Sequence, residues 1–158
     1  LELKGLLSLI TDTTQYEIHF FFNDEFKENF ANMAYEIIDI KDLKESNNKD
    51  LKHNLEEEGN AILANISSDE YVITLEILGT MLESPELASK ISKLLTYGNT
   101  NITFVIGGSY GLSDSVKQRS NFALSFSKMT FPHQLMRVIL IEQIYRSFKI
   151  MNNEKYHK

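Results

Sequence analysis

Apolar and polar residues alternate along this chain in short blocks, and the block at residues 102–111, ITFVIGGSYG, is the most informative. Its first five residues are all β-branched or aromatic, which is typical of a strand buried on both faces of a sheet. Gly107 and Gly108 end this strand and, without a Cβ, allow a ligand to approach the main chain. Ser113 and Asp114 then favour a helix start. This order indicates either a ligand-binding crevice at the carboxyl end of a central strand or a tight turn without a ligand.

A second strand is predicted at residues 71–77, YVITLEI, ahead of a helix with clear boundaries. Ser84 is the expected N-cap, Pro85 suits the first helical position, and Gly98 is the expected residue after the last turn. Strand, helix and strand form a βαβ unit, whose connection is normally right-handed. We therefore expect strands 71–77 and 102–106 to lie parallel in one sheet.

Weaker patterns predict the remaining elements of an α/β fold. Strands are expected at residues 16–22, 35–40 and 122–126, and helices at residues 24–33, 51–66 and 113–119, with a polar loop or helix start at 41–50. A last helix is expected from Pro132 to Met151. Its apolar residues occupy most of its circumference, so it is either covered by its own sheet on one side and a second copy of the chain on the other, or is a central core helix.

Length and composition fit a single globular domain. The chain has 158 residues, of which 42% are hydrophobic and 24% charged, a balance that favours a packed core over disorder. No apolar run approaches the roughly 20 residues needed to cross a bilayer, and no secretory signal is visible, so the cytoplasm is the expected location. The absence of cysteine excludes disulfides, thiolate metal sites and cysteine nucleophiles.

The charge is unevenly distributed along the chain. The net charge is −6, but residues 1–110 carry 8 Lys and Arg against 19 Asp and Glu, whereas residues 111–158 carry 8 against 3. A basic C-terminal third permits a polyanionic partner on one face of the molecule. It is equally consistent with charges that balance between neighbouring faces or protomers.

The candidate chemistry lies in this basic third, since no hydrolase, zinc-protease or Walker A motif is present and the glycine turn lacks the complete dinucleotide fingerprint. His133 and Arg137 are four residues apart, a spacing at which two side chains on one helix meet the same ligand; a histidine at a helix start is also often a cap or a surface group. Glu142 and Arg146 follow on the same helix. The tail Tyr156-His157-Lys158 combines a ring, an imidazole and a cation, which suits a base and its phosphate or is a frayed end.

Several of these segments together resemble a known family. They are VITLEI with Gly79, FVIGGSYGL at 104–112, QRSNFALSFSKMTFPHQLMRVILIEQIYRSFKIM at 118–151, and the closing YHK. In this combination they resemble the bacterial large-subunit ribosomal RNA pseudouridine N3-methyltransferases of the SPOUT class, over about residues 55–158. Residues 1–44 diverge, because they lack the short basic strand and Val-Gly-Lys turn with which that family usually begins.

The resemblance implies a single α/β domain with a parallel sheet, helices on both faces and a C-terminal trefoil knot. It further implies a homodimer, S-adenosylmethionine as cofactor, the ribosome or its large-subunit RNA as partner, and no metal. The implied cofactor contacts are Leu75, Gly107, Gly108, Phe126, Ser127, Lys128, Met129, Thr130 and Phe131. His157, Arg137 and Tyr156 are implied as catalytic residues, and His133, Tyr145, Arg146 and Lys158 as substrate-binding residues.

By this resemblance the expected activity is methylation of large-subunit ribosomal RNA at N3 of a pseudouridine. Removal of the N3 proton needs stabilisation of the deprotonated base, for which His157 or a neighbouring cation is the candidate, with Arg137 on a phosphate or carbonyl oxygen. Two alternatives belong to other classes. In the first alternative, the chain is a dimeric interaction module that binds the cofactor but neither catalyses a reaction nor docks on RNA. In the second, it is a small-molecule enzyme on a nucleotide-binding sheet.

Overall fold

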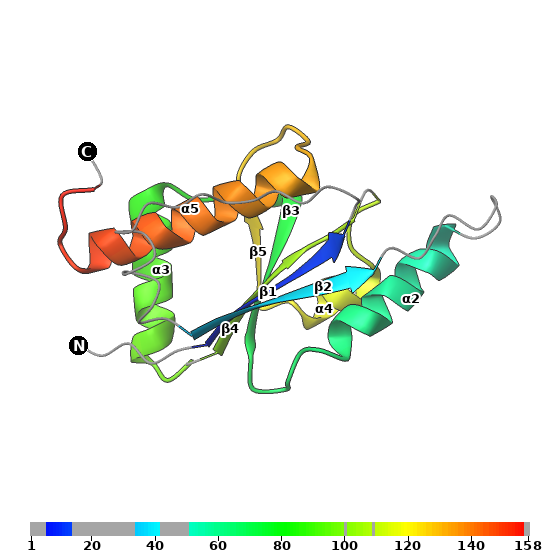
Figure 1. Ribbon diagram of the computed structural model, residues 1–158. Helices are drawn as coiled ribbons and strands as arrows, with labels where there is room; N and C mark the ends of the chain where they lie inside the picture. Colours follow the sequence, from blue (N-terminus) through cyan, green and yellow to red (C-terminus); the bar gives the residue numbers. More distant parts are fainter. Residues whose placement is uncertain (1–5, 14–33, 42–50, 100, 109, 157–158) are drawn as a thin grey trace.

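The computed structural model describes residues 6–13, 34–41, 51–99, 101–108 and 110–156, with the backbone path alone for the first two segments. Five strands form one sheet in the order β2-β1-β4-β3-β5, and every neighbouring pair is parallel (Figure 1). Their bounds are β1 (Leu6–Thr13), β2 (Ala34–Lys41), β3 (Tyr71–Met81), β4 (Asn101–Ile106) and β5 (Phe122–Ser125). The expected central strand is therefore confirmed, since β4 lies in the middle of the sheet.

The βαβ unit is also confirmed, with one correction at the start of its helix. Helix α3 (Ser84–Thr96) connects β3 to β4, and Gly98, with a φ of 91°, follows its C-cap as predicted. The N-cap is Glu83 and not Ser84, so that prediction is wrong. The Glu83 N–H donates to Glu86 Oε2 over 2.7 Å, whereas the Ser84 hydroxyl donates to Gln143 Oε1 on the last helix over 2.7 Å. The Ser84 hydroxyl is thus engaged in a tertiary hydrogen bond with Gln143 and does not cap the helix.

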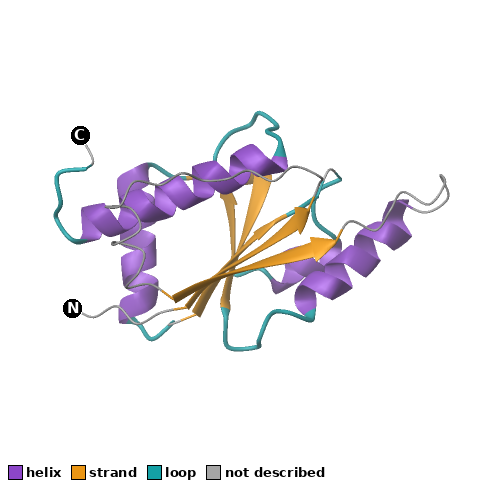
Figure 2. Cartoon of the chain, viewed as in Figure 1, coloured by secondary structure: helices purple, strands orange, loops and turns teal. Residues whose placement is uncertain are grey.

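Helices cover both faces of the sheet, as Figure 2 shows. One face packs against α3 and α5 (His133–Met151), and its core contains Ile73 and Phe104 of the sheet. The other face packs against α2 (Leu51–Leu63) and α4 (Asp114–Arg119), and its core contains Val72 and Val105. Successive residues of β3 and β4 point to opposite faces, which explains why apolar residues occur at both odd and even positions of these strands. The α/β class with helices on both faces is confirmed, and the trefoil knot stays a prediction.

The N-terminal part of the sheet was predicted only in part. The strand expected at 35–40 is β2, whereas the prediction missed β1, which lies between β2 and β4. The strand expected at 16–22 and the helix expected at 24–33 lie outside the described residues. Within the part of the chain that is described, no helix is both long and apolar enough to cross a membrane.

Helix α5 is buried unevenly around its circumference. Leu140 is fully buried and Ile144 nearly so in the core with the sheet and α3, and Tyr145 is nearly buried with its ring against that of Tyr156. Leu135, near the start of the helix, remains 44% exposed, and several other apolar residues of α5 are only half-buried. One chain therefore covers one side of α5 completely and leaves apolar surface on another side.

Candidate functional site

A cleft of about 840 Å³ opens at the carboxyl ends of β3 and β4. This is the edge of a parallel sheet at which ligands usually bind, and the volume is in the range of small-molecule sites. Its wall is made by Leu75, Glu76, Ile77, Leu78, Ile106, Gly107, Gly108, Gly111, Leu112, Lys117, Leu124, Phe126, Ser127, Met129, Thr130, Phe131, Pro132, His133 and Met136. The wall is mostly apolar, with a few charged and polar side chains.

The glycine turn after β4 forms one wall of the cleft and has no room for a side chain. A Cβ on Gly107 would lie 2.7 Å from the Gly111 carbonyl oxygen and 2.9 Å from Leu112 Cγ. The turn is closed by a hydrogen bond from the Gly111 N–H to the Gly108 carbonyl over 2.9 Å, and Gly111 has a φ of 85°. The main chain at Gly107 therefore faces the cleft with no side chain to cover it, as the sequence had indicated.

An irregularity in β3 shapes the opposite rim. The pairing of β3 with β5 shifts register between Leu75 and Thr80, and a Cβ on Gly79 would lie 2.8 Å from the Ala123 carbonyl. The residues in the bulge leave the sheet, so that Leu78 is 97% exposed at the cleft edge. The rim thus presents apolar side chains to solvent.

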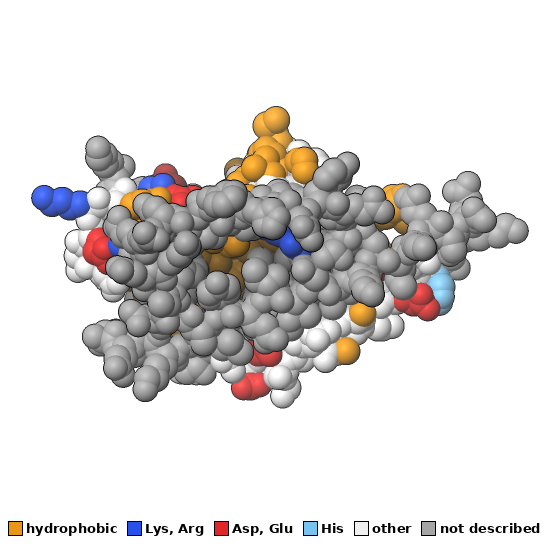
Figure 3. Space-filling view, in the orientation of Figure 1, with side chains coloured by type: hydrophobic (Ala, Val, Ile, Leu, Met, Phe, Trp, Pro, Cys, Tyr) orange, Lys and Arg blue, Asp and Glu red, His pale blue; other side chains and the backbone are white. Residues whose placement is uncertain are grey.

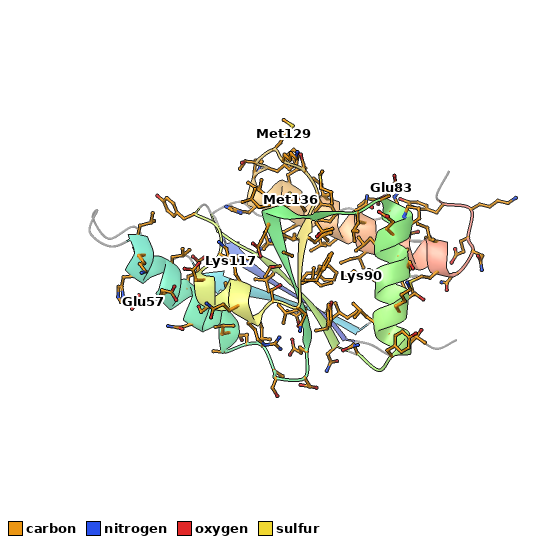
Figure 4. The ribbon with its side chains drawn as sticks, turned by 180° about the vertical axis from the view of Figure 1, so that it is seen from behind. Glu57, Glu83, Lys90, Lys117, Met129 and Met136 are labelled. Atoms are coloured by element: carbon orange, nitrogen blue, oxygen red, sulfur yellow. The ribbon has the colours of Figure 1, made fainter. Side chains whose placement is uncertain are left out.

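The segment between β5 and α5 completes the wall, and local hydrogen bonds fix its path. The Ser125 hydroxyl lies 3.0 Å from the Ile77 carbonyl and 3.1 Å from the Ser127 carbonyl. The Met129 N–H donates to Ser127 Oγ over 2.9 Å, and Met129 is 69% exposed at the top of the segment (Figure 4). In the space-filling view, a hydrophobic projection stands at the same place (Figure 3).

The structure brings most of the expected cofactor contacts to this cleft. Its wall includes Leu75, Gly107, Gly108, Phe126, Ser127, Met129, Thr130 and Phe131. Lys128 is exposed and is not part of the wall. His133, expected as a substrate residue, also lines the cleft at the first turn of α5, and Arg137 follows it one turn later as a half-buried side chain.

The other candidate residues form a separate cluster between the middle of α5 and the chain that follows it. Arg146 pairs with Glu142 over 2.6 Å, and the Tyr156 hydroxyl lies 3.1 Å from both Glu142 oxygens. The rings of Tyr145 and Tyr156 meet edge to face with centroids 5.0 Å apart, and the Arg146 guanidinium lies 4.8 Å from the Tyr156 ring centre. Glu142 is thus the shared acceptor of Arg146 and Tyr156, and Tyr145 joins the cluster through the Tyr156 ring.

The residues after α5 fold back onto this cluster, and an ion pair between Lys149 and Glu154 stabilises their position. Lys149 is 4% exposed and contacts Glu154 over 2.5 Å. The hydrogen bond to Glu154 raises the pKa of Lys149, and the same bond lowers the pKa of Glu154. Burial and the nearby Glu142 carboxylate raise the pKa of Tyr156, so its phenol stays protonated at neutral pH and donates to Glu142.

Within one chain the candidate residues therefore divide into two groups. His133 lies in the cleft, whereas Glu142 lies nine residues further along α5, roughly 13 Å at 1.5 Å per residue. Neither Tyr145, Arg146 nor Tyr156 reaches the cleft wall. His157 and Lys158 lie outside the described residues.

Several cleft residues were not predicted as site residues, among them Glu76, Lys117 and Met136. Glu76 carried a signal, because it is an acid at the end of an otherwise apolar strand, YVITLEI. Lys117 and Met136 carried none, since only the fold brings α4 and α5 to the same edge of the sheet. Among the residues the structure describes, no group of three or more His, Asp or Glu side chains is placed to hold a metal ion.

Comparison with known proteins places the sequence of this chain in a family. A family model described as "Predicted SPOUT methyltransferase" matches residues 9–157. A relative from Methanococcus vannielii is 58% identical over 125 residues, which cover 77% of this chain and 79% of the relative. That relative is named "Putative ribosomal RNA large subunit methyltransferase H". The family match extends well into the N-terminal part that diverges in its sequence pattern.

Proposed function

This chain belongs to the SPOUT methyltransferase family, and from that premise we propose that it methylates large-subunit ribosomal RNA at N3 of a pseudouridine, with S-adenosylmethionine as methyl donor. The observation that carries this proposal is the cleft at the carboxyl ends of β3 and β4, bounded by the glycine turn and by the segment leading into α5. The name of the relative from Methanococcus vannielii supports the RNA substrate.

The residues of the cleft fit an adenosyl ligand. Leu75, Ile106 and Met136 offer apolar surface for a flat base, and the bare main chain at Gly107 allows close approach. S-adenosylmethionine supplies an electrophilic methyl group when bound. The protein must then align the attacking nitrogen with that methyl group, and positioning of this kind accounts for much of the rate in such reactions.

We assign the basic residues to the substrate. Arg137, one turn after the cleft residue His133, holds a phosphate or a carbonyl oxygen, and His157 or a neighbouring cation stabilises the uracil ring after loss of its N3 proton. Tyr145, Arg146, Tyr156 and Lys158 contact the RNA. A ribosomal substrate places the protein in the cytoplasm, and the trefoil knot belongs to the same proposal.

The homodimer is also part of this proposal. The separation of the cleft from the Glu142 cluster within one chain, and the exposed apolar surface around Leu135, both support a second copy packed on α5. Such a copy would bring its own basic end to the neighbouring cleft. A wild-type chain that sediments as a monomer at micromolar concentration contradicts this arrangement.

Methyl transfer from labelled S-adenosylmethionine to ribosomes tests the function directly. We expect label in large-subunit RNA of intact ribosomes that lack the modification, and mass spectrometry of the digested RNA should identify N3-methylpseudouridine. Binding of S-adenosylmethionine without transfer to ribosomes or naked RNA would instead indicate an interaction module. Failure to bind S-adenosylmethionine in calorimetry would favour a small-molecule enzyme of another class.

The His157→Ala variant tests the role of the tail. We expect turnover to fall by about a hundredfold, the effect typical of a lost acid–base group, while affinity for S-adenosylmethionine stays within about twofold of wild type. His53→Ala is the matched control, because His53 lies on α2 and pairs there with Glu57 over 3.2 Å. Equal losses of binding and turnover, or no loss in either, would show that the assigned role is wrong.

A further inference from the structure

Two charged side chains of the cleft have no role in the assignments above. Glu76 and Lys117 are the carboxylate and the ammonium group of the wall, and His133 is the remaining titratable side chain there. Glu76 is half-buried, and Lys117 is exposed on α4. A cleft with one negatively charged and one positively charged side chain is complementary to a ligand that carries both charges.

A buried hydroxyl group holds the Glu76 carboxylate in position. Thr74 is fully buried, and its hydroxyl donates to Glu76 Oε1 over 2.7 Å. The Ser120 hydroxyl lies 2.8 Å from that of Thr74 and also donates to the Phe122 carbonyl over 3.0 Å. One oxygen of Glu76 is therefore held in place, and the carboxylate belongs to the cleft wall as a preoriented group.

The strand geometry places Glu76 and Lys117 on the same side of the cleft. Thr74 and Glu76 are two residues apart on β3, and their hydrogen bond shows that they share one face of the sheet. That face carries Val72 and packs against α4, the helix of Lys117. Leu75 points to the opposite face, where Met136 of α5 lies; Figure 4 shows Lys117 and Met136 on helices from the two sides.

The cleft thus has a charged side next to α4 and an apolar side next to α5. S-adenosylmethionine has the same division, because its adenine is flat and largely apolar whereas its amino-acid end carries an ammonium and a carboxylate group. Resting on the proposed function, we propose that Glu76 binds the α-ammonium group of the methyl donor and that Lys117 binds its α-carboxylate. The adenosyl part then occupies the side formed by Leu75, Leu124 and Met136.

Charge complementarity favours this orientation over one in which Glu76 holds the ribose. Two neutral ribose hydroxyl groups would leave the charge of the half-buried Glu76 carboxylate uncompensated. An ammonium group is attracted to the Glu76 carboxylate by its charge as well as by the hydrogen bond, whereas a ribose hydroxyl group offers the hydrogen bond alone, so the zwitterionic end gains most from these two residues. A site that pairs both charges also discriminates against analogues that lack them.

Calorimetric titration of the full chain with four ligands tests the proposal. S-adenosylmethionine and S-adenosylhomocysteine carry both charges of the amino-acid end, decarboxylated S-adenosylmethionine carries only the ammonium group, and methylthioadenosine carries neither. The variants are Glu76→Gln, which keeps an acceptor for Thr74, and Lys117→Met. Glu57→Gln and Lys52→Met on exposed positions of α2 are the matched controls.

We expect Glu76→Gln to weaken the first three ligands by about tenfold and to leave methylthioadenosine within about twofold. Lys117→Met should weaken only the two ligands that carry a carboxylate. The inference is overturned if Glu76→Gln weakens all four ligands equally, as a ribose contact would, or weakens only the two sulfonium ligands. It is also overturned if neither variant differs from the controls.

This outcome is separable from the proposed function. If wild-type protein binds S-adenosylmethionine and methylates ribosomes while the variants match their controls, the inference about Glu76 and Lys117 fails and the function stands. If wild-type protein binds none of the four ligands, the proposed function fails first. Circular dichroism of each variant shows whether the fold is retained, which the conserved hydrogen-bonding capacity of Gln at position 76 favours.

Discussion

Replacing Gly107 by Ala is expected to reduce methyl transfer by about a hundredfold, because a shift near 1 Å at a reacting site typically costs that much. The new Cβ would lie 2.7 Å from the Gly111 carbonyl oxygen and 2.8 Å from its carbonyl carbon. Both are main-chain atoms, and Leu112 beside them is buried, so no flexible side chain can yield. The turn must therefore move, and the wall of the cleft moves with it.

The expected readouts are affinity for S-adenosylmethionine by calorimetry, which should fall at least about tenfold, and turnover on ribosomes. Gly98→Ala is the matched control. Gly98 also follows a regular element, but it has a φ of 91° and nothing within 4 Å of an added Cβ. That variant should lose about 1 kcal/mol of stability and bind normally. Wild-type affinity in Gly107→Ala would show that the turn does not shape the ligand site.

Replacing Leu140 by Ala is expected to lower the free energy of unfolding by about 3 kcal/mol. Leu140 lies on α5, and its side chain is fully buried against the sheet in the core that contains Ile73 and Phe104. Removal of its side chain leaves a cavity that tightly packed neighbours fill only in part. Since small domains are stable by only about 5–15 kcal/mol, this single change removes a large share of the total.

Urea denaturation followed by circular dichroism measures this loss. Leu51→Ala is the matched control, because Leu51 is 54% exposed at the start of α2 and its truncation should change stability by less than about 0.5 kcal/mol. A loss below about 1 kcal/mol in Leu140→Ala would contradict the packing of α5 described above. A parallel decrease in affinity for S-adenosylmethionine is expected, since the first turn of α5 lines the cleft through His133 and Met136.

The sequence predicted the elements whose signals are local. The strand before Gly107 carries apolar residues on both faces, and the helix that contains Pro85 ends just before Gly98, so the strand and the end of the helix were predicted correctly. β1 was missed because the residues of this part of the chain give a weak local pattern, and its parallel partners are too distant in the sequence to support it. The N-cap at Glu83 was missed because a contact of Ser84 with α5 decides it.

In the candidate site, too, features with a local sequence signal were predicted and features that depend on tertiary contacts were not. The glycine turn was located from the residues themselves, whereas the segment 126–131 was located only through the family resemblance. Glu76 and Lys117 were not predicted as cleft residues. They share one side of the cleft because of the alternation of side chains along β3 and the position of α4, and neither feature forms a sequence motif. The attachment of Tyr156 to Glu142 likewise depends on the chain turning back after α5.

The strand order has a consequence for how the polypeptide folds during synthesis. β1 lies between β2 and β4, so one of its edges stays unpaired until residues 101–106 have left the ribosome. All strand pairs are parallel and several join distant parts of the chain, an arrangement that closes slowly and leaves a strand edge open to wrong partners in the meantime. The nascent N-terminal half is therefore expected to need protection from aggregation until the middle of the sheet arrives.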